Sequence, residues 1–340
     1  MKSRQVAQLL VFVLAILLVP LGLNHWLPKK QPFNRKPLER LRAEHPSIVL
    51  IGDSLVHAAI DPTLLEKELG MGRIAMIWRG GAASAAWYLT LKNHVVASGV
   101  KPRWVCIFFT YDLLTNASFR TTATYRAFLE SLMHGEDPVC QMVLGDAAQR
   151  QTPLQRIASR LYPLNDRRHH YQEKISRFAF RTESLVGPKI KGLPRRVNEI
   201  FDVARLRQET LPQTPEAVAA RSLVFSADPK KNFLPHIVEV AKAGGIPLCF
   251  VRVRPNPGAD NEFEEGAELW AYVAQLRNWI ETQGCVFIDT TGEKRFRPEM
   301  YLRPDDDHIG PWAKEEATKI YAEVLRPILE GRAQPARLEP

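Results

Sequence analysis

The chain of 340 residues alternates short, continuous apolar runs with longer segments of helical periodicity. A run that is apolar at every position is typical of a strand buried on both faces, and strands that alternate with helices favour a parallel sheet. The sequence therefore predicts a doubly wound α/β domain over residues 47–330, with helices on both faces of the sheet. The predicted strands cover residues 47–51, 73–78, 104–109, 246–253 and 285–289, and the predicted helices cover residues 62–69, 84–98, 233–243, 267–282 and 311–329.

The alternation is interrupted between about residues 116 and 228. This stretch combines helical periodicity and scattered proline with a basic, aromatic tract that includes residues 167–181. In open α/β sheets ligands bind outside the carboxyl ends of the strands, so insertions there often shape the substrate cleft. We predict a helical insertion above the sheet. A solvated excursion that contacts no ligand is the alternative interpretation.

The first 28 residues predict a membrane anchor. Basic residues precede an apolar run from Leu9 to Leu23, and counting from Val6 to Leu27 brings it to about the 20 residues that span a bilayer core. No small-x-small cleavage site closes the run, which favours an uncleaved signal anchor. Because basic residues flank both ends, the charge pattern does not fix the orientation. We expect an extracytoplasmic (periplasmic) domain, a polar stalk over residues 29–46 and a flexible tail over residues 331–340.

The net charge of +9 and the isoelectric point near 9.4 suit an anionic partner, which could be a nucleic acid, a membrane surface or a polymer. The sequence contains no zinc-finger spacing, aromatic RNA-binding motif or P-loop, so we do not expect a nucleic-acid partner. A solvated basic surface is the plainer interpretation. The four cysteines lack metal-ligand spacing and are expected to be buried thiols, and no metal is predicted; they are Cys106, Cys140, Cys249 and Cys285.

Two short motifs supply the parts of a nucleophilic site. Gly52-Asp53-Ser54-Leu55 directly follows the first predicted strand, which would place the Ser54 hydroxyl at a strand-to-helix junction. A nucleophilic serine needs a general base within hydrogen-bond reach. The sequence Asp305-Asp306-Asp307-His308 precedes the last predicted helix, and a single turn could let Asp305 hold the imidazole of His308 while its other ring nitrogen faces Ser54.

These motifs resemble the first and last conserved blocks of the SGNH (GDSL) hydrolases, and they lie at the corresponding places in the α/β alternation. The resemblance covers most of residues 47–330 and implies a flavodoxin-like, three-layer fold. It also implies that Ser54 is the nucleophile and that Asp305 and His308 complete a catalytic triad. The backbone N–H of Ser54 would then donate to the oxyanion.

The two middle blocks of the family match less well. Gly80-Gly81 follows the second strand, and by resemblance Gly81, or alternatively Gly80, supplies a second N–H to the oxyanion hole. Where the family has a third-block asparagine, this chain has Tyr111, so one side-chain donor is missing. Thr110, the Tyr111 hydroxyl or Asn116 are the candidate substitutes.

Further polar residues could line the cleft. Asp53 adjoins the nucleophile, and His57 could reach the cleft or simply pack against the fold. His94 is expected on the surface of a helix. Arg252 and Arg254 end a strand, where they could meet an anionic substrate or form an ion pair with the acidic loop 260–265.

The resemblance therefore implies acyl transfer without a cofactor, on an ester of a cell-envelope polysaccharide, and we expect the acyl group to be acetyl. The enzyme would be an esterase or an O-acyltransferase, and a membrane acyl-donor protein could be its partner. Two alternatives stay open. One is a catalytically degenerate protein that binds an envelope polymer without turnover. The other is a membrane-surface adaptor that uses the basic stretch from Arg156 to Arg196.

Overall fold

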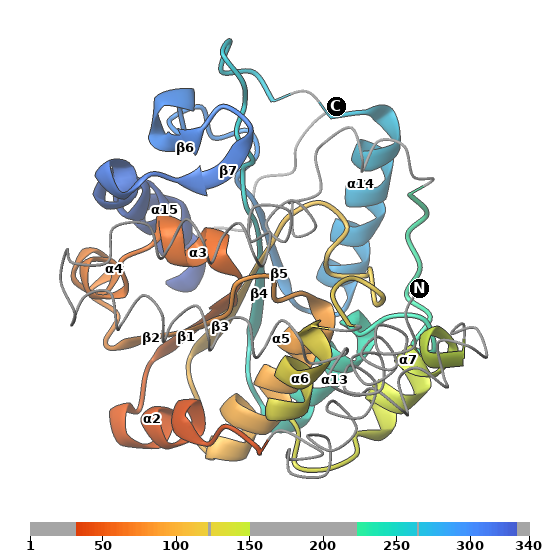
Figure 1. Cartoon of the computed structure of the whole chain (residues 1–340). Helices are drawn as coiled ribbons and strands as arrows, with labels where there is room; N and C mark the ends of the chain where they lie inside the picture. Colours follow the sequence, from red (N-terminus) through yellow and green to blue (C-terminus); the bar gives the residue numbers. More distant parts are fainter. Residues whose placement is uncertain (1–31, 122–123, 150–222, 264, 332–340) are drawn as a thin grey trace, which may run out of the picture. The chain divides into compact units, whose positions relative to one another are not determined.

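The computed structural model describes residues 32–121, 124–149, 223–263 and 265–331 (Figure 1). Its centre is a five-stranded parallel sheet with the strand order β2-β1-β3-β4-β5. Every residue of β1 is buried, as the apolar run at this position predicted. The strands are β1 (Ile48–Gly52), β2 (Ile74–Trp78), β3 (Trp104–Phe109), β4 (Leu248–Arg252) and β5 (Val286–Asp289).

Helices cover both faces of the sheet (Figure 1). On one face, Ile48 and Leu50 of β1 share a hydrophobic cluster with residues of α3, α4 and α15. Helices α5, α13 and α14 lie on the other side of the sheet. The helices are α2 (Lys36–Glu44), α3 (Ser54–Ala59), α4 (Pro62–Leu69), α5 (Ser84–Thr90), α6 (Thr124–Ser131), α7 (Pro138–Gln149), α13 (Leu234–Gly244), α14 (Ala267–Thr282) and α15 (Lys314–Leu329).

Short elements complete the described part of the chain. A π-helical turn η1 (Leu91–Val95) and a 3-10 turn η2 (Val96–Ser98) extend α5, so the predicted helix over 84–98 is present with a changed winding. A two-stranded antiparallel hairpin, β6 (Tyr301–Arg303) and β7 (Asp306–Ile309), precedes α15. The turns η4 (Pro298–Met300) and η5 (Pro311–Ala313) flank this hairpin.

The structure confirms the predicted α/β class and corrects one boundary. Residues 29–46 were predicted to be a stalk, but residues 36–44 form α2, in which Leu38 and Leu41 are buried. The stretch is polar on average, and only its two leucines at helical spacing indicate a packed face. The predicted anchor at 1–28, the tail from residue 332 onward and the larger part of the insertion lie outside the described residues.

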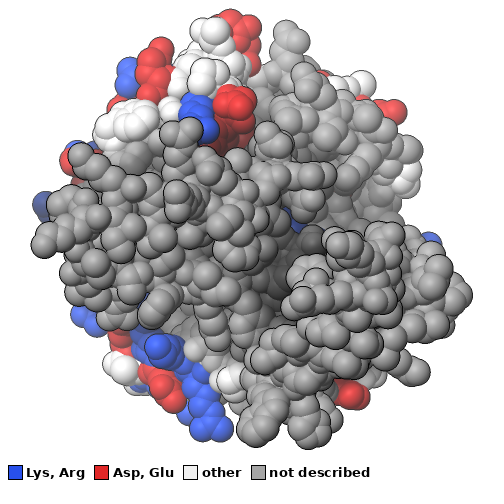
Figure 2. Space-filling view, in the orientation of Figure 1, with Lys and Arg blue, Asp and Glu red and all other residues white. Residues whose placement is uncertain are grey.

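Among the described residues, no helix combines the length and the apolar character needed to cross a bilayer. Within the same part of the chain, charged side chains of both signs lie next to one another. Figure 2 shows blue and red residues interspersed at the upper and lower margins of this face. Local ion pairs explain part of this mixing, for example Arg297 with Glu316 and Lys319 with Glu315. The basic stretch from Arg156 to Arg196 is not among the described residues.

Gly52 ends β1 where the chain turns into α3 with almost no space beside its Cα. A Cβ at this position would lie 2.5 Å from Cγ1 of Val56 and 3.4 Å from Cβ of Phe108. Both neighbours are buried, so neither can move away without disturbing the core. The glycine therefore lets α3 pack directly against the sheet.

We expect Gly52→Ala to lower the free energy of unfolding by about 1–3 kcal/mol, because the added methyl group overpacks the junction of β1 and α3. Gly80→Ala is the matched control, since a Cβ at Gly80 meets no atom within 4 Å. Urea unfolding midpoints of the two variants test this. Equal midpoints would contradict the packing argument.

Candidate active site

Ser54 is the first residue of α3, and Asp53 alone separates it from Gly52, the last residue of β1. Asp53 makes this junction short, because its extended backbone and its side chain cap the helix. The Asp53 carboxylate accepts the backbone N–H of Leu55 at 2.9 Å. Ser54 is thus held at the carboxyl edge of the sheet, where ligands bind in open α/β folds.

His308 reaches Ser54 from β7, 254 residues further along the chain. Its Nε2 lies 2.8 Å from Ser54 Oγ, within hydrogen-bond distance. Both side chains are half-buried. The structure therefore brings together the serine and the histidine that the sequence motifs singled out.

The carboxylate beside His308 belongs to Asp306 and not to Asp305. Asp306 Oδ1 lies 2.5 Å from His308 Nδ1 and also accepts the His308 backbone N–H at 3.0 Å. Asp305 is exposed in the turn between β6 and β7. The prediction assumed a helical turn, but this segment is a strand, in which residues two apart share a face. Asp306 is two residues before His308, and Asp305 is three.

The alternation of the strand directs Asp307 elsewhere, toward Tyr111. Asp307 Oδ2 accepts the Tyr111 hydroxyl at 3.3 Å, and Oδ1 accepts the backbone N–H of Asn256 at 3.0 Å. Burial raises the pKa of Asp307, although these two donors and the charge of His308 oppose the effect. Burial likewise raises the pKa of Tyr111 far above its ordinary value. Buried Tyr111 and half-buried Asp307 thus link the loop after β3 to the hairpin.

The candidate substitutes for the third-block asparagine have other contacts. The Tyr111 hydroxyl donates to Asp307, and the Asn116 amide donates to Asp112 Oδ2 at 3.0 Å. Thr110 is buried directly after β3. Tyr111 also has a φ of 48°, in the left-handed region that bulky side chains rarely adopt. The loop is therefore shaped around the tyrosine–aspartate contact and not around an exposed donor.

Gly80 and Gly81 form the turn that follows β2. The backbone N–H of Ala82 donates to the Arg79 carbonyl at 2.9 Å, and Gly81 has a φ of 75°. The Arg79 N–H donates to the Gly52 carbonyl at 3.4 Å, which ties the turn to the end of β1. Gly81 is buried and Gly80 is exposed. The turn predicted to contribute to the oxyanion hole is thus adjacent to the strand end that carries Ser54.

Arg252 and Arg254 are both buried and occupied by protein partners. Arg252 Nη1 lies 3.2 Å from Asp289 Oδ2, and its Nη2 contacts Glu265. The ion pair with the acidic loop, which the sequence left open, is therefore the arrangement found. Arg254 donates to the backbone carbonyls of Thr291 and Asn261. Both guanidinium groups are thus bonded to protein groups other than Ser54 and His308.

His57 and His94 make contacts outside the Ser54–His308–Asp306 hydrogen bonds. His57 stacks on Trp78 with ring centroids 3.7 Å apart. His94 was expected on a helix surface, but it is fully buried, stacks on Phe33 and lies with Nε2 2.9 Å from the Asn34 carbonyl. The expectation failed because residues 33–44 were treated as a stalk, whereas they cover this side of η1.

The cysteines are free thiols, and Cys106 and Cys249 are neighbours across β3 and β4. Cys106, Cys140 and Cys249 are buried and Cys285 is partly exposed, in keeping with core packing. In the part of the chain that the structure describes, no group of three or more His, Cys, Asp or Glu residues could hold a metal ion.

The site can be compared with known proteins. No protein-family model matches the sequence, and no curated protein matches it. A GDSL-like lipase from Bacteroides thetaiotaomicron is 12% identical over 88% of this chain and 98% of that chain, with a TM-score of 0.38. A lipase/acylhydrolase from Enterococcus faecalis is 12% identical over 86% and 100%, with a TM-score of 0.36. The acetyl xylan esterase AlAXEase is 11% identical over 82% and 99%, with a TM-score of 0.33. These values are too low to carry a conclusion about activity.

Asp53 has an unusual charge state for a helix cap. Burial raises its pKa from 3.8 to about 6, while the Leu55 N–H and the charges of His308 and Arg120 lower it. The folded protein therefore keeps a proton on Asp53 at pH values where the unfolded chain has released it. As pH rises from about 4 to about 6, this contribution to stability is lost.

We expect Asp53→Asn to stabilise the protein at pH above about 7, by on the order of 1 kcal/mol, because it removes a desolvated charge and asparagine still caps the helix. Water screens part of the charge because the Asp53 side chain is partly exposed, so the gain in the free energy of unfolding is smaller than the pKa shift alone would give. Near pH 4 the variant and the wild type should have equal stability. Urea titrations at both pH values test this, and a pH-independent difference would contradict the assignment.

Proposed function

We propose that the chain is an SGNH-type serine esterase. The observation that carries the proposal is the continuous line from Ser54 Oγ through the two ring nitrogens of His308 to Asp306, with contacts of 2.8 and 2.5 Å. This is the arrangement that activates a serine hydroxyl: a base within reach, oriented by a carboxylate on its far side. The two sequence motifs that it joins resemble the first and last blocks of the SGNH hydrolases.

In the proposed reaction, His308 Nε2 takes the proton of Ser54 while Oγ attacks the carbonyl carbon of an ester. Asp306 holds the ring through Nδ1 and stabilises the imidazolium. His308 then gives its proton to the leaving alkoxide oxygen, and the C–O bond breaks to leave an acyl-serine. Water, or a sugar hydroxyl in a transferase, attacks the acyl-serine with His308 again as base, and Ser54 recovers its proton.

The oxyanion would be held by backbone N–H groups of Ser54 and Gly81. The Ser54 N–H lies in the first turn of α3, where helices leave their amides without intrahelical partners. The third donor of the family is absent because the Tyr111 hydroxyl is committed to Asp307. Loss of one such donor costs roughly a hundredfold in rate, so we expect a slow enzyme.

The substrate we infer is an acetyl ester of a cell-envelope polysaccharide. The apolar run within residues 1–28 supports a single-pass anchor that would keep the domain at the envelope, on the periplasmic side. A membrane acyl-donor protein would then be a natural partner for acyl transfer. Nothing in the motifs suggests a nucleic acid or a cofactor as part of this reaction.

One observation favours a second candidate, a protein that binds such a polymer without turnover. Tyr111 is buried in a backbone conformation that it rarely adopts, and its hydroxyl is turned to Asp307. A loop with this structure lacks the side-chain amide donor that active members of the family use in the oxyanion hole. The two candidates share the fold and differ in whether Ser54 reacts.

A fluorophosphonate probe separates them. We expect the full-length chain, purified in detergent, to be labelled covalently, since the probe reacts with activated serines. Labelling should vanish in Ser54→Ala and fall at least about a hundredfold in rate in His308→Ala. Intact mass spectrometry gives the extent of labelling. A folded wild-type protein that takes no label and does not cleave p-nitrophenyl acetate would exclude the esterase and leave the binding protein.

Neighbouring aspartates provide a matched test of the carboxylate. We expect Asp306→Asn to lower kcat on p-nitrophenyl acetate by on the order of a thousandfold, because the amide carries no charge to stabilise the imidazolium and its NH2 can donate to Nδ1, which fixes the wrong tautomer. Asp305→Asn, exposed in the turn, should change kcat by less than about twofold. If Asp305→Asn has the larger effect, the hairpin geometry does not describe the working enzyme.

A further inference from the structure

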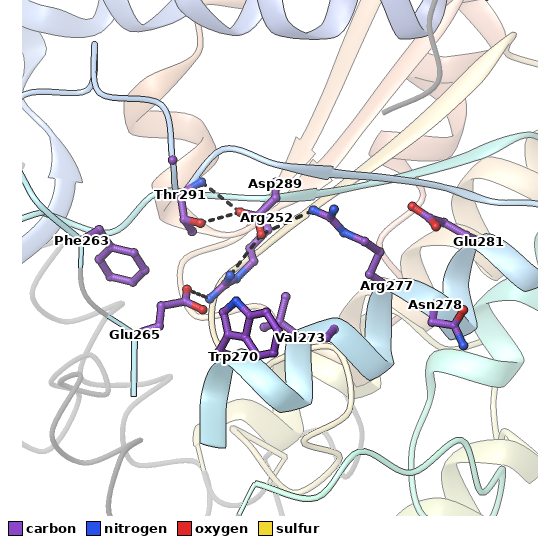
Figure 3. Close-up of a pocket in the computed structure, with 12 residues that line it drawn as sticks. Arg252, Phe263, Glu265, Trp270, Val273, Arg277, Asn278, Glu281, Asp289 and Thr291 are labelled. Atoms are coloured by element: carbon purple, nitrogen blue, oxygen red, sulfur yellow. Dashed lines mark hydrogen bonds and ion pairs between the residues drawn. The ribbon is translucent and has the colours of Figure 1, made fainter. Parts of the chain in front are cut away.

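A cavity of about 510 Å³ lies between α14 and the carboxyl ends of β4 and β5 (Figure 3). This volume falls in the range of small-molecule sites, roughly 300–1,000 Å³. We call it the α14 pocket. Its lining includes Trp270, Arg277 and Asn278 from the helix, and Arg252 and Asp289 from the strand ends.

The strand-end side of the α14 pocket is a fixed network of charges. Arg252 is 2% exposed and bonded to both Asp289 and Glu265. Asp289 also accepts the backbone N–H and the hydroxyl of Thr291, at 3.0 and 2.7 Å. Arg277 lies 3.8 Å from Asp289, and its guanidinium stacks over the ring of Phe287 at 4.9 Å. These groups hold their positions without a ligand, so a ligand would meet preorganised donors and acceptors.

The charge of the lining argues against an anionic ligand. The pocket has two cations, Arg252 and Arg277, and three carboxylates, so negative charges outnumber positive ones. The carboxylates are those of Glu265, Glu281 and Asp289. A phosphate, a sulfate or an acidic sugar would lie against at least one uncompensated negative charge. A purely apolar acyl chain would leave the ionised groups without water, which is also unfavourable. The lining suits a neutral ligand that carries many hydroxyl groups.

Aromatic side chains add the apolar part of the lining. Trp270 is 48% exposed although it is a large ring, and Phe263 also lines the pocket. Figure 3 shows both rings near Glu265, with Arg277 and Asn278 further along α14. Flat aromatic surfaces beside planar amide, guanidinium and carboxylate groups match a sugar ring, which has apolar C–H faces and a rim of hydroxyls.

One side chain connects the α14 pocket to the proposed catalytic site. Arg252 of the pocket pairs across the sheet with Phe109, two residues before Tyr111, and the Tyr111 hydroxyl donates to Asp307 in the hairpin. Asp307 adjoins Asp306 and His308 in β7. A ligand in the pocket would therefore lie at the same carboxyl edge of the sheet as Ser54.

We propose that the α14 pocket is a carbohydrate-binding subsite that holds one neutral sugar unit of a polymer whose ester group reacts at Ser54. The location of the ester rests on the proposed esterase function. Sugar binding in the pocket does not depend on it.

Calorimetric titration tests the binding. The probes are xylohexaose, mannohexaose, cellohexaose and chitohexaose, added to the full-length chain in a detergent without a sugar headgroup. We expect saturable binding of at least one, weakened about tenfold or more by Trp270→Ala, which removes the exposed ring. Trp312→Ala is the matched control, because Trp312 is 65% exposed and lies outside the pocket, and it should leave the affinity unchanged.

Two results would overturn the subsite. One is that none of the four probes binds the wild type, and the other is that Trp270→Ala binds as the wild type does. Kinetics separate this failure from failure of the esterase. Trp270→Ala should keep kcat/KM for p-nitrophenyl acetate and raise KM for an acetylated oligosaccharide of the bound type. Sugar binding without fluorophosphonate labelling would reject only the esterase, whereas labelling without sugar binding would reject only the subsite.

Discussion

The parallel pairing of β1 with both β2 and β3 is the constraint on which the site depends. Parallel strands end at the same edge, so the loops after β1, β2, β3 and β4 meet there although they are far apart in sequence. The edge then brings together Ser54 after β1, the glycine turn after β2 and the loop with Tyr111 after β3. Burial of β1 on both faces fixes its position, and Gly52 allows α3 to start without a spacer.

A strand period of two divides three consecutive aspartates among three tasks. Asp305 lies in the exposed turn of the hairpin, Asp306 faces His308, and Asp307 faces Tyr111. Asp306 thus orients His308 within β7, while Asp307 ties the hairpin to Tyr111 and to the backbone N–H of Asn256. Because His308 belongs to the same strand as Asp307, the hydrogen bond to Tyr111 also restrains the position of the imidazole. The identity of the neighbouring carboxylate follows from secondary structure, and not from its distance along the chain.

Sequence patterns located the elements that are apolar throughout or strongly periodic. The helices at 62–69 and 267–282 and the strand at 104–109 have the predicted bounds, and the predicted Ser54 and His308 are in contact. The β6–β7 hairpin was missed because its strands are short and polar, so no alternation of apolar residues marks them. Helix α2 was missed for a similar reason, since two buried leucines are its main signal. Because that segment was predicted to be a stalk, His94 was expected to be exposed, whereas Phe33 and Asn34 cover it.

Tyr111 explains why the catalytic edge differs from the family pattern that the sequence resembles. An asparagine at this position would present an amide to the oxyanion, whereas the tyrosine hydroxyl extends to Asp307 and its ring is buried. The charges of Arg252 and Glu265, which line the α14 pocket, also affect the pKa of Tyr111. The tyrosine thus gives the loop after β3 a direct contact with the hairpin, where an asparagine would present an amide instead. The loop after β3 and the strand that carries His308 therefore share one hydrogen bond, which links the hairpin to the end of β3.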